Sequence, residues 1–128
     1  MQRNLDLMRH LLLAAEAAPG SVNLLDLDLD GAEFPLLAHQ AELLVEAGLL
    51  KAQLSYTDGN ATPVYVQIER LSWQGHEFLD LIRDDRAWDE VKGVALARGV
   101  PLSFEVVRRL RLAAVRTALG GEDPGTSG

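Results

Sequence analysis

Apolar residues recur at helical spacing at the start of the chain. They are Leu5, Met8, Leu12 and Ala15. Asn4 or Asp6 can accept hydrogen bonds from the first free backbone amides, and Pro19-Gly20 stops a helix. The pattern therefore predicts a first helix from about residue 5 to the turn at Pro19.

The pattern changes in the stretch SVNLLDLDLDGAEF, which begins at Ser21. Leucines and aspartates alternate there, with Leu at 25, 27 and 29 and Asp at 26, 28 and 30. Alternation with a period of two is typical of a strand that has one buried face and one face in solvent. We expect a short strand with an acidic outer face.

Helical spacing returns in PLLAHQAELLVEAG, where Pro35 suits a first turn and Gly48 suits a helix end. The stretches LLKAQLSY and VYVQIERL then read as two strands, and Asp58-Gly59 between them marks a hairpin turn. On a helical wheel of the second helix, Leu37, Ala41, Leu44, Val45 and Gly48 cluster on the inner side.

The remaining pattern is helical. Ser72 can cap a helix that reaches about Arg83, and Asp84 or Asp85 can start another that stops at Arg98-Gly99. Pro101 and Ser103 open a last helix with an apolar stripe, which either packs on the domain or forms a dimer interface. The stripe contains Val106, Val107, Leu110, Ala113, Ala114 and Ala118. The polar, Gly-rich tail over residues 120–128 is expected to be disordered.

The order of these elements favours an α+β fold of winged helix-turn-helix type. Helix, short strand, helix and β-hairpin wing follow one another, and additional C-terminal helices come after them. A chain of 128 residues falls in the size range of one domain. We therefore expect residues 1–119 to form a single winged-helix-like domain with a helical extension.

Composition narrows the possible partners and compartments. The net charge of -7 disfavours general attraction to nucleic acid or to an anionic membrane. The chain has no cysteine, which excludes disulfides and thiolate chemistry and fits a reducing cytoplasm. Asp6 and Glu16 flank an N-terminal apolar run that is too short for a signal peptide or a membrane span, so we expect no membrane association.

Three stretches carry a resemblance to a known family. They are MQRNLDLMRHLLLAAE, AHQAELLVEAGLLKAQ and RLSWQGHEFLDLIRDDRAWDEVK. Together they resemble the bacterial and phage family called domain of unknown function 2513, over roughly residues 1–101. The resemblance implies a winged-helix-like fold and a setting on phages or mobile elements. It assigns no catalytic residues, because no activity is established for that family.

Two short motifs suggest metal chemistry but lack ligands. Asp26 to Gly31 begins like a calcium loop, yet Leu37 stands where the bidentate glutamate is required. His76-Glu77 suggests a zinc hydrolase, yet Asp80 stands where the second histidine is required. With no nucleophile, base and orienting group together, we expect neither an enzyme nor a cofactor.

A packing role explains the same stretch better. Trp73, Phe78, Leu79, Ile82 and Trp88 have the spacing of a core. Gly75 would let the helix approach the hairpin closely. His76 would then be partly buried beside the hairpin and bonded to Asp80 or to a backbone carbonyl.

The helix before the hairpin is the element that reads DNA in a winged helix, so its outer face is the first candidate site. It comprises Leu36, His39, Gln40, Leu43 and Glu46. Gln40 and His39 have groups that can read bases, but the helix has no Lys or Arg, and Glu42 and Glu46 would repel phosphates. The hairpin between Ser55 and Gln67 has no basic residue either.

Positive charge gathers in the last helix, at Arg108, Arg109, Arg111 and Arg116. These arginines form either a solvated face or a patch for phosphates or an acidic partner. Two functions therefore stay open. We favour a non-enzymatic module that binds a host protein through the outer face of the second helix. The alternative is a dimeric DNA-binding transcription regulator, with the last helix as a possible dimer contact.

Overall fold

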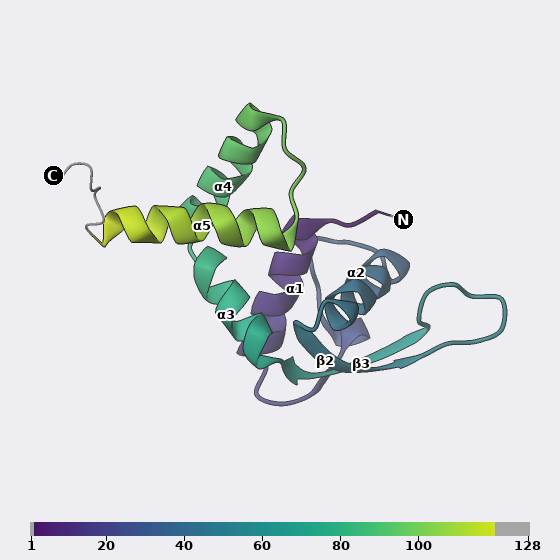
Figure 1. The fold of residues 1–128 in the computed structure, drawn as a ribbon. Coiled ribbons are helices and arrows are strands. Elements are labelled where there is room, and N and C mark those ends of the chain that lie inside the picture. The colour runs from purple at the N-terminus through teal and green to yellow at the C-terminus, as the bar shows by residue number, and fades with distance from the viewer. Residues whose placement is uncertain (1, 120–128) are drawn as a thin grey trace, which may run out of the picture. The chain divides into compact units, whose positions relative to one another are not determined.

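The computed structural model describes residues 2–119, which form an α+β fold with a small antiparallel sheet (Figure 1). The described elements follow in the order α1 (Leu5–Ala17), β1 (Val22–Asn23), the 3-10 helix η1 (Leu24–Asp26), α2 (Phe34–Glu46), β2 (Leu50–Ser55), β3 (Tyr65–Leu71), α3 (Trp73–Ile82), α4 (Asp85–Arg98) and α5 (Phe104–Ala118). The chain divides into two compact units, with the boundary between Leu79 and Asp80. The proposed disordered tail, residues 120–128, lies outside the described residues.

Helix α1 confirms the first prediction and shows which of the two candidate residues is its N-cap. The Asn4 side chain accepts a hydrogen bond from the Leu7 amide at 3.0 Å, so Asn4 rather than Asp6 occupies the cap position. The helix ends at Ala17, before Pro19. All four apolar positions of the predicted stripe are buried, which anchors α1 in the core of the first unit.

The predicted strand over the leucine–aspartate alternation is wrong. Only Val22 and Asn23 pair with β3, and the chain then turns into η1. The Asn23 side chain causes this turn, because its oxygen accepts from the Leu25 amide at 2.9 Å and caps a 3-10 turn. Leu24 is consequently buried, while Leu25 is 66% exposed, which breaks the alternation.

The acidic end of that stretch contacts α1 and does not pair with a strand of the sheet. Asp30 has a φ of 58°, an uncommon left-handed conformation, and Gly31 follows it at 67°. The Asp30 carboxylate lies 2.5 Å from Nδ1 of His10 on α1. Residues 27–33 therefore form an irregular connection, and its aspartates alternate without belonging to a strand.

The sheet has the order β1-β3-β2 with antiparallel pairing throughout. Both predicted hairpin strands are confirmed, with Gln53 opposite Gln67 and Ser55 opposite Tyr65. Val66 and Ile68 are fully buried on the face against which α1 packs. Alternate residues of β3 face outward from Tyr65 to Glu69, and the alternation shifts by one residue at Arg70, opposite the register shift between Lys51 and Ala52.

Ser72 and Gly75 join the sheet to α3. The Ser72 hydroxyl donates to the Gly48 carbonyl at 2.5 Å and accepts from the Gly75 amide at 3.0 Å. The Ser72 amide also donates to the Leu49 carbonyl at 3.1 Å. A Cβ on Gly75 would lie 2.0 Å from that same Leu49 oxygen, so only glycine fits. The close approach predicted for Gly75 is confirmed.

The predicted core positions of α3 and of the start of α4 are confirmed except for Trp73. Phe78, Leu79, Ile82 and Trp88 are buried, but Trp73 is 72% exposed. Trp73 lies two residues before Gly75, which places it about 200° around the helix from the contact face. The cap geometry at Ser72 thus turns this indole into solvent.

His76 also differs from the prediction. It is about half exposed, and its Nδ1 lies 3.2 Å from a Glu16 carboxylate oxygen on α1. The proposed partner Asp80 instead forms an ion pair with Arg83 at 2.7 Å. His76 therefore contacts α1 rather than a residue of its own helix.

The second unit holds α4 and α5, whose ends follow local signals. Gly99 ends α4 with a φ of 67°, and the Ser103 hydroxyl caps α5 through the Val106 amide at 3.2 Å. Only Val107 of the α5 residues is fully buried, and Ala113, Ala114 and Ala118 are exposed. In the described part of the chain no helix is long and apolar enough to span a bilayer.

The Ser72 junction yields a first prediction. Gly75→Ala should lower the free energy of unfolding by about 3 kcal/mol or more, because the added methyl meets an immobile backbone oxygen. Gly93→Ala, at a helical position with nothing within 4 Å, should raise it by about 0.5–1 kcal/mol. Urea unfolding followed by circular dichroism measures both. An unchanged free energy of unfolding in Gly75→Ala would contradict the close approach of α3 to the Leu49 carbonyl.

Candidate functional site

The outer side of α2 is the surface that the sequence singled out. Glu46 is exposed, and Leu36, His39 and Leu43 are each partly exposed. These four residues share one helix that ends at the base of the hairpin, so they form a continuous surface beside β2. With Glu42 and with Tyr56 of the hairpin, they are called the α2–hairpin face below.

Gln40 does not belong to this face, which corrects the prediction. Its side chain is 0% exposed. The amide oxygen accepts from the Asn4 backbone at 2.8 Å, and the amide nitrogen donates to the Gln2 carbonyl at 3.0 Å. The inner side of α2 is rotated toward Ala38 and Gln40, and the predicted inner residues Val45 and Gly48 are not buried. Gln40 holds the chain before α1 and is not available to read a base.

Tyr56 brings the hairpin and α2 together. It directly follows β2, and its hydroxyl donates a hydrogen bond to the Glu42 carboxylate. This bond, desolvation and the negative charges of Glu42 and Glu46 raise the pKa of Tyr56 to about 12. A carboxylate can only accept here, so the phenol must keep its proton for the bond to exist.

The electrostatic character of the α2–hairpin face is negative. Glu42 lies between Tyr56 and His39, whose Nδ1 is 3.6 Å from the other carboxylate oxygen. Within the described residues, the buried Nδ1 of His39 has no hydrogen-bond partner. Asp58 adds a further exposed acid in the hairpin loop. The cations of the hairpin are Lys51 on β2 and Arg70 on β3. They are opposite each other in the strand register, at the end of the hairpin away from its loop.

The four arginines proposed as a second contact region are not equivalent. Arg108 and Arg116 are exposed, and Arg109 is exposed while pairing with Glu105 at 2.6 Å. Arg111 is only 17% exposed, and its Nε donates to the Leu81 carbonyl at 2.9 Å. Arg111 therefore connects α5 to the last turn of α3, which removes it from the set that could contact a phosphate.

The two metal motifs acquire structural partners instead of ligands. His10 lies beside Asp30, and His76 lies beside Glu16. Among residues 2–119 no group of three His, Asp or Glu side chains could hold a metal ion. The Asp26 to Gly31 stretch lies in η1 and the irregular connection that follows it.

Sequence reasoning missed Tyr56 as a member of the site. Its partner Glu42 is 14 residues earlier, on a different type of element. No periodic pattern connects a helix residue to a residue just beyond a strand. The absence of Lys and Arg from the helix, which the sequence did show, is what leaves the acids of this face unneutralised.

Tyr56 yields a second prediction. In a Tyr65→Phe background Tyr56 is the remaining tyrosine, and ultraviolet absorbance should report its ionisation at about 12. Glu42→Gln should lower this pKa toward the ordinary value of 10.0, because it removes the anionic acceptor. Glu69→Gln, an exposed acid on β3 that binds Gln53, is the matched control and should leave it unchanged.

The same shift has a consequence for stability. The folded pKa lies above the ordinary value, so between about pH 10 and 12 the folded chain keeps a proton that the unfolded chain loses. The free energy of unfolding should therefore fall as the pH rises through this window, and less so in Glu42→Gln. Equal slopes for both chains would argue against the Tyr56–Glu42 bond.

Comparison with known proteins identifies the family but no activity. The chain is 34% identical over 113 residues to an uncharacterized protein of Haemophilus influenzae (strain ATCC 51907 / DSM 11121 / KW20 / Rd), covering 86% of this chain and 92% of that protein. No solved structure matches the chain. The profile of the family described as hypothetical protein (DUF2513) matches residues 2–101. The chain therefore belongs to the DUF2513 family, as its sequence resemblance indicated.

Proposed function

We propose that this protein is a non-enzymatic, cytoplasmic winged-helix module that binds a protein partner through the α2–hairpin face. The order of α1, β1, α2 and the β2–β3 hairpin supports the winged-helix interpretation, with α2 in the position of a recognition helix. The absence of cysteine supports a reducing compartment. Host protein partners and a phage or mobile-element setting are part of the same proposal.

The observation that carries this proposal is the bond between Tyr56 and Glu42. A recognition helix and wing that bind DNA present donors and cations to phosphates. Here Tyr56 beside the hairpin donates its hydroxyl to an acid of the helix, and this hydrogen bond, followed by desolvation and by the charges of Glu42 and Glu46, raises the pKa of Tyr56. Leu36 and Leu43 add partly exposed apolar area beside these acids. Such a surface suits a partner with an apolar centre and a basic rim.

Leu43→Asp gives the third prediction. A charge in the centre of the face should weaken partner binding by about 2 kcal/mol or more, as for an interface hot spot, while the fold stays intact. Tagged chains would be used for capture from the native host, followed by quantitative mass spectrometry, with circular dichroism to verify folding. Leu96→Asp, at a leucine that is 84% exposed on α4, is the matched control. A partner retained equally by both variants would exclude this face.

A second function, DNA binding as a dimeric transcription regulator, has one observation in its favour. Arg108, Arg109 and Arg116 are exposed along α5 and could contact phosphates. Glu46→Lys separates the two functions, because it exchanges an acid of the α2–hairpin face for a cation. It should weaken capture of a basic protein partner, whereas it should strengthen binding if this face meets DNA.

The DNA function makes a fourth, independent prediction. A gel shift with the native upstream region at low salt should show a complex whose affinity falls steeply as salt rises. Arg108→Ala combined with Arg109→Ala should reduce the slope by about two. The absence of any complex at low salt would leave protein binding as the function of this fold.

A further inference from the structure

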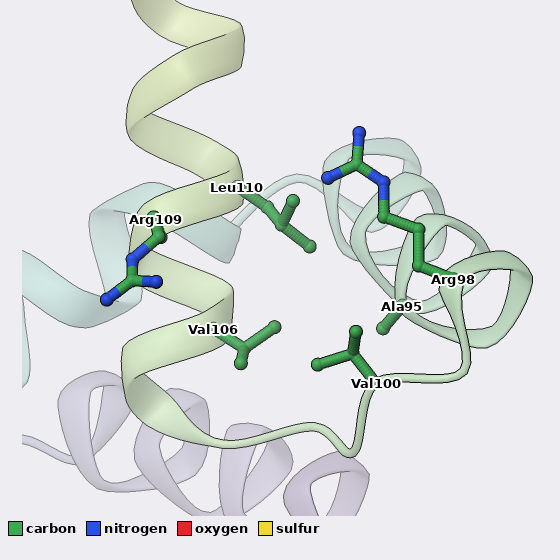
Figure 2. Close-up of a pocket in the computed structure, with 6 residues that line it drawn as sticks. All are labelled: Ala95, Arg98, Val100, Val106, Arg109 and Leu110. Atoms are coloured by element: carbon green, nitrogen blue, oxygen red, sulfur yellow. The ribbon is translucent and has the colours of Figure 1, made fainter.

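Helices α4 and α5 enclose two apolar hollows that the proposed function does not use. One has a volume of about 150 Å³ and the other of about 200 Å³. The first is lined by Ala95, Arg98, Val100, Val106, Arg109 and Leu110. In Figure 2 the side chains of Val100, Val106 and Leu110 point toward the space between the two helices. The second is lined by Glu90, Val91, Val94, Arg98, Leu110, Arg111, Ala113 and Ala114.

The two hollows are neighbours, because Arg98 and Leu110 line both. Aliphatic side chains supply most of the lining, and several remain open to solvent. Val94 is 37% and Val100 is 39% exposed. A cavity of about 150 Å³ lined by apolar residues is large enough for one ring or one branched side chain. The α4–α5 groove, meaning these two hollows and Arg98, thus has room for two apolar side chains.

Arg98 is the charge that the groove leaves uncompensated. Arg109 pairs with Glu105 at 2.6 Å, and Figure 2 shows its guanidinium turned away from the hollow. Arg111 bonds the Leu81 carbonyl and lies 4.0 Å from Glu90. In the described part of the chain, no carboxylate pairs with Arg98. Its place in the last turn of α4 suits the helix dipole, which explains a basic residue there but not a cation between two apolar hollows.

We propose that the α4–α5 groove binds a short acidic segment of a partner protein. A carboxylate of that segment would form an ion pair with Arg98, and an apolar side chain on each side of it would fill one hollow. A guanidinium beside apolar surface is weakly hydrated and matches a carboxylate in a fork geometry, so both parts of the segment are bound at little cost in solvation. This surface is formed by residues of the second unit, whereas the α2–hairpin face is formed by residues of the first.

Charge disfavours two other occupants. Helix α5 carries four arginines against one glutamate, so pairing α5 with α5 of a second copy would bring like charges together. Nucleic acid is disfavoured because none of the residues lining the groove is aromatic, so unpaired bases have no stacking platform. The aliphatic hollows likewise offer nothing to a phosphate backbone.

The test is a selection of random peptides displayed on phage against the immobilised full chain. Selected peptides should share an Asp or Glu flanked by Leu, Ile, Val or Phe. The most enriched peptide would then be synthesised with a fluorophore and titrated by fluorescence anisotropy. Arg98→Glu and Val94→Asp should each raise its Kd by about tenfold or more, since each opposes one part of the binding mode.

Arg108→Glu is the matched control, because it makes the same charge change at an exposed α5 position that lines neither hollow. It should raise the Kd by less than about threefold, the effect of a screened charge. Circular dichroism verifies that each variant is folded. A Kd that rises equally for Arg98→Glu and Arg108→Glu would overturn the ion pair in the groove and leave only diffuse attraction.

Three further outcomes would overturn the proposal. The first is that no peptide is enriched, or that the enriched peptides lack an acid. The second is a dimer in analytical ultracentrifugation that Val94→Asp dissociates, which would assign the groove to a second copy. The third is that double-stranded DNA displaces the peptide from the unsubstituted chain but not from the Arg108→Glu chain. That result would assign binding to the exposed arginines.

Discussion

The Ser72 hydroxyl joins three elements of the first unit through two hydrogen bonds. It donates to the carbonyl of Gly48, where α2 has ended, and it accepts from the amide of Gly75, where α3 begins. The missing side chain of Gly75 allows α3 to lie against the Leu49 carbonyl, at a distance that any Cβ would forbid. The direction of the hairpin relative to α2 depends on this contact, because β2 starts at Leu50.

That contact also determines the character of the α2–hairpin face. With α2 and β2 fixed at their junction, Tyr56 comes within bonding distance of Glu42. An acid that would otherwise be an isolated surface charge becomes part of a cluster with His39 and Glu46 nearby. The face is consequently acidic and partly apolar, and α2 itself carries no Lys or Arg. Acids on this face disfavour contact with a phosphate backbone, which agrees with the proposed protein partner.

Local chemistry made the helix ends predictable. Asn4, Ser103 and Gly99 act through atoms within a few residues of themselves, so caps and stops follow from the sequence. The strand predicted over the leucine–aspartate alternation failed for the same local reason. Asn23 forms its own turn, and the sheet offers pairing only to two residues there. A period of two describes a possible strand, but a strand also requires a neighbour with free backbone groups.

By itself the sequence determined the α-helices, the hairpin, the family and the lack of cations on α2. Each of these follows from spacing or composition along the chain. The tertiary structure alone decided that Gln40 is buried, that Trp73 is exposed and that Arg111 is held by Leu81. It also decided that Tyr56 meets Glu42 and that Arg98 lies between two hollows. These facts depend on which distant groups share space, and a helical wheel records only the phase of a residue on its own helix.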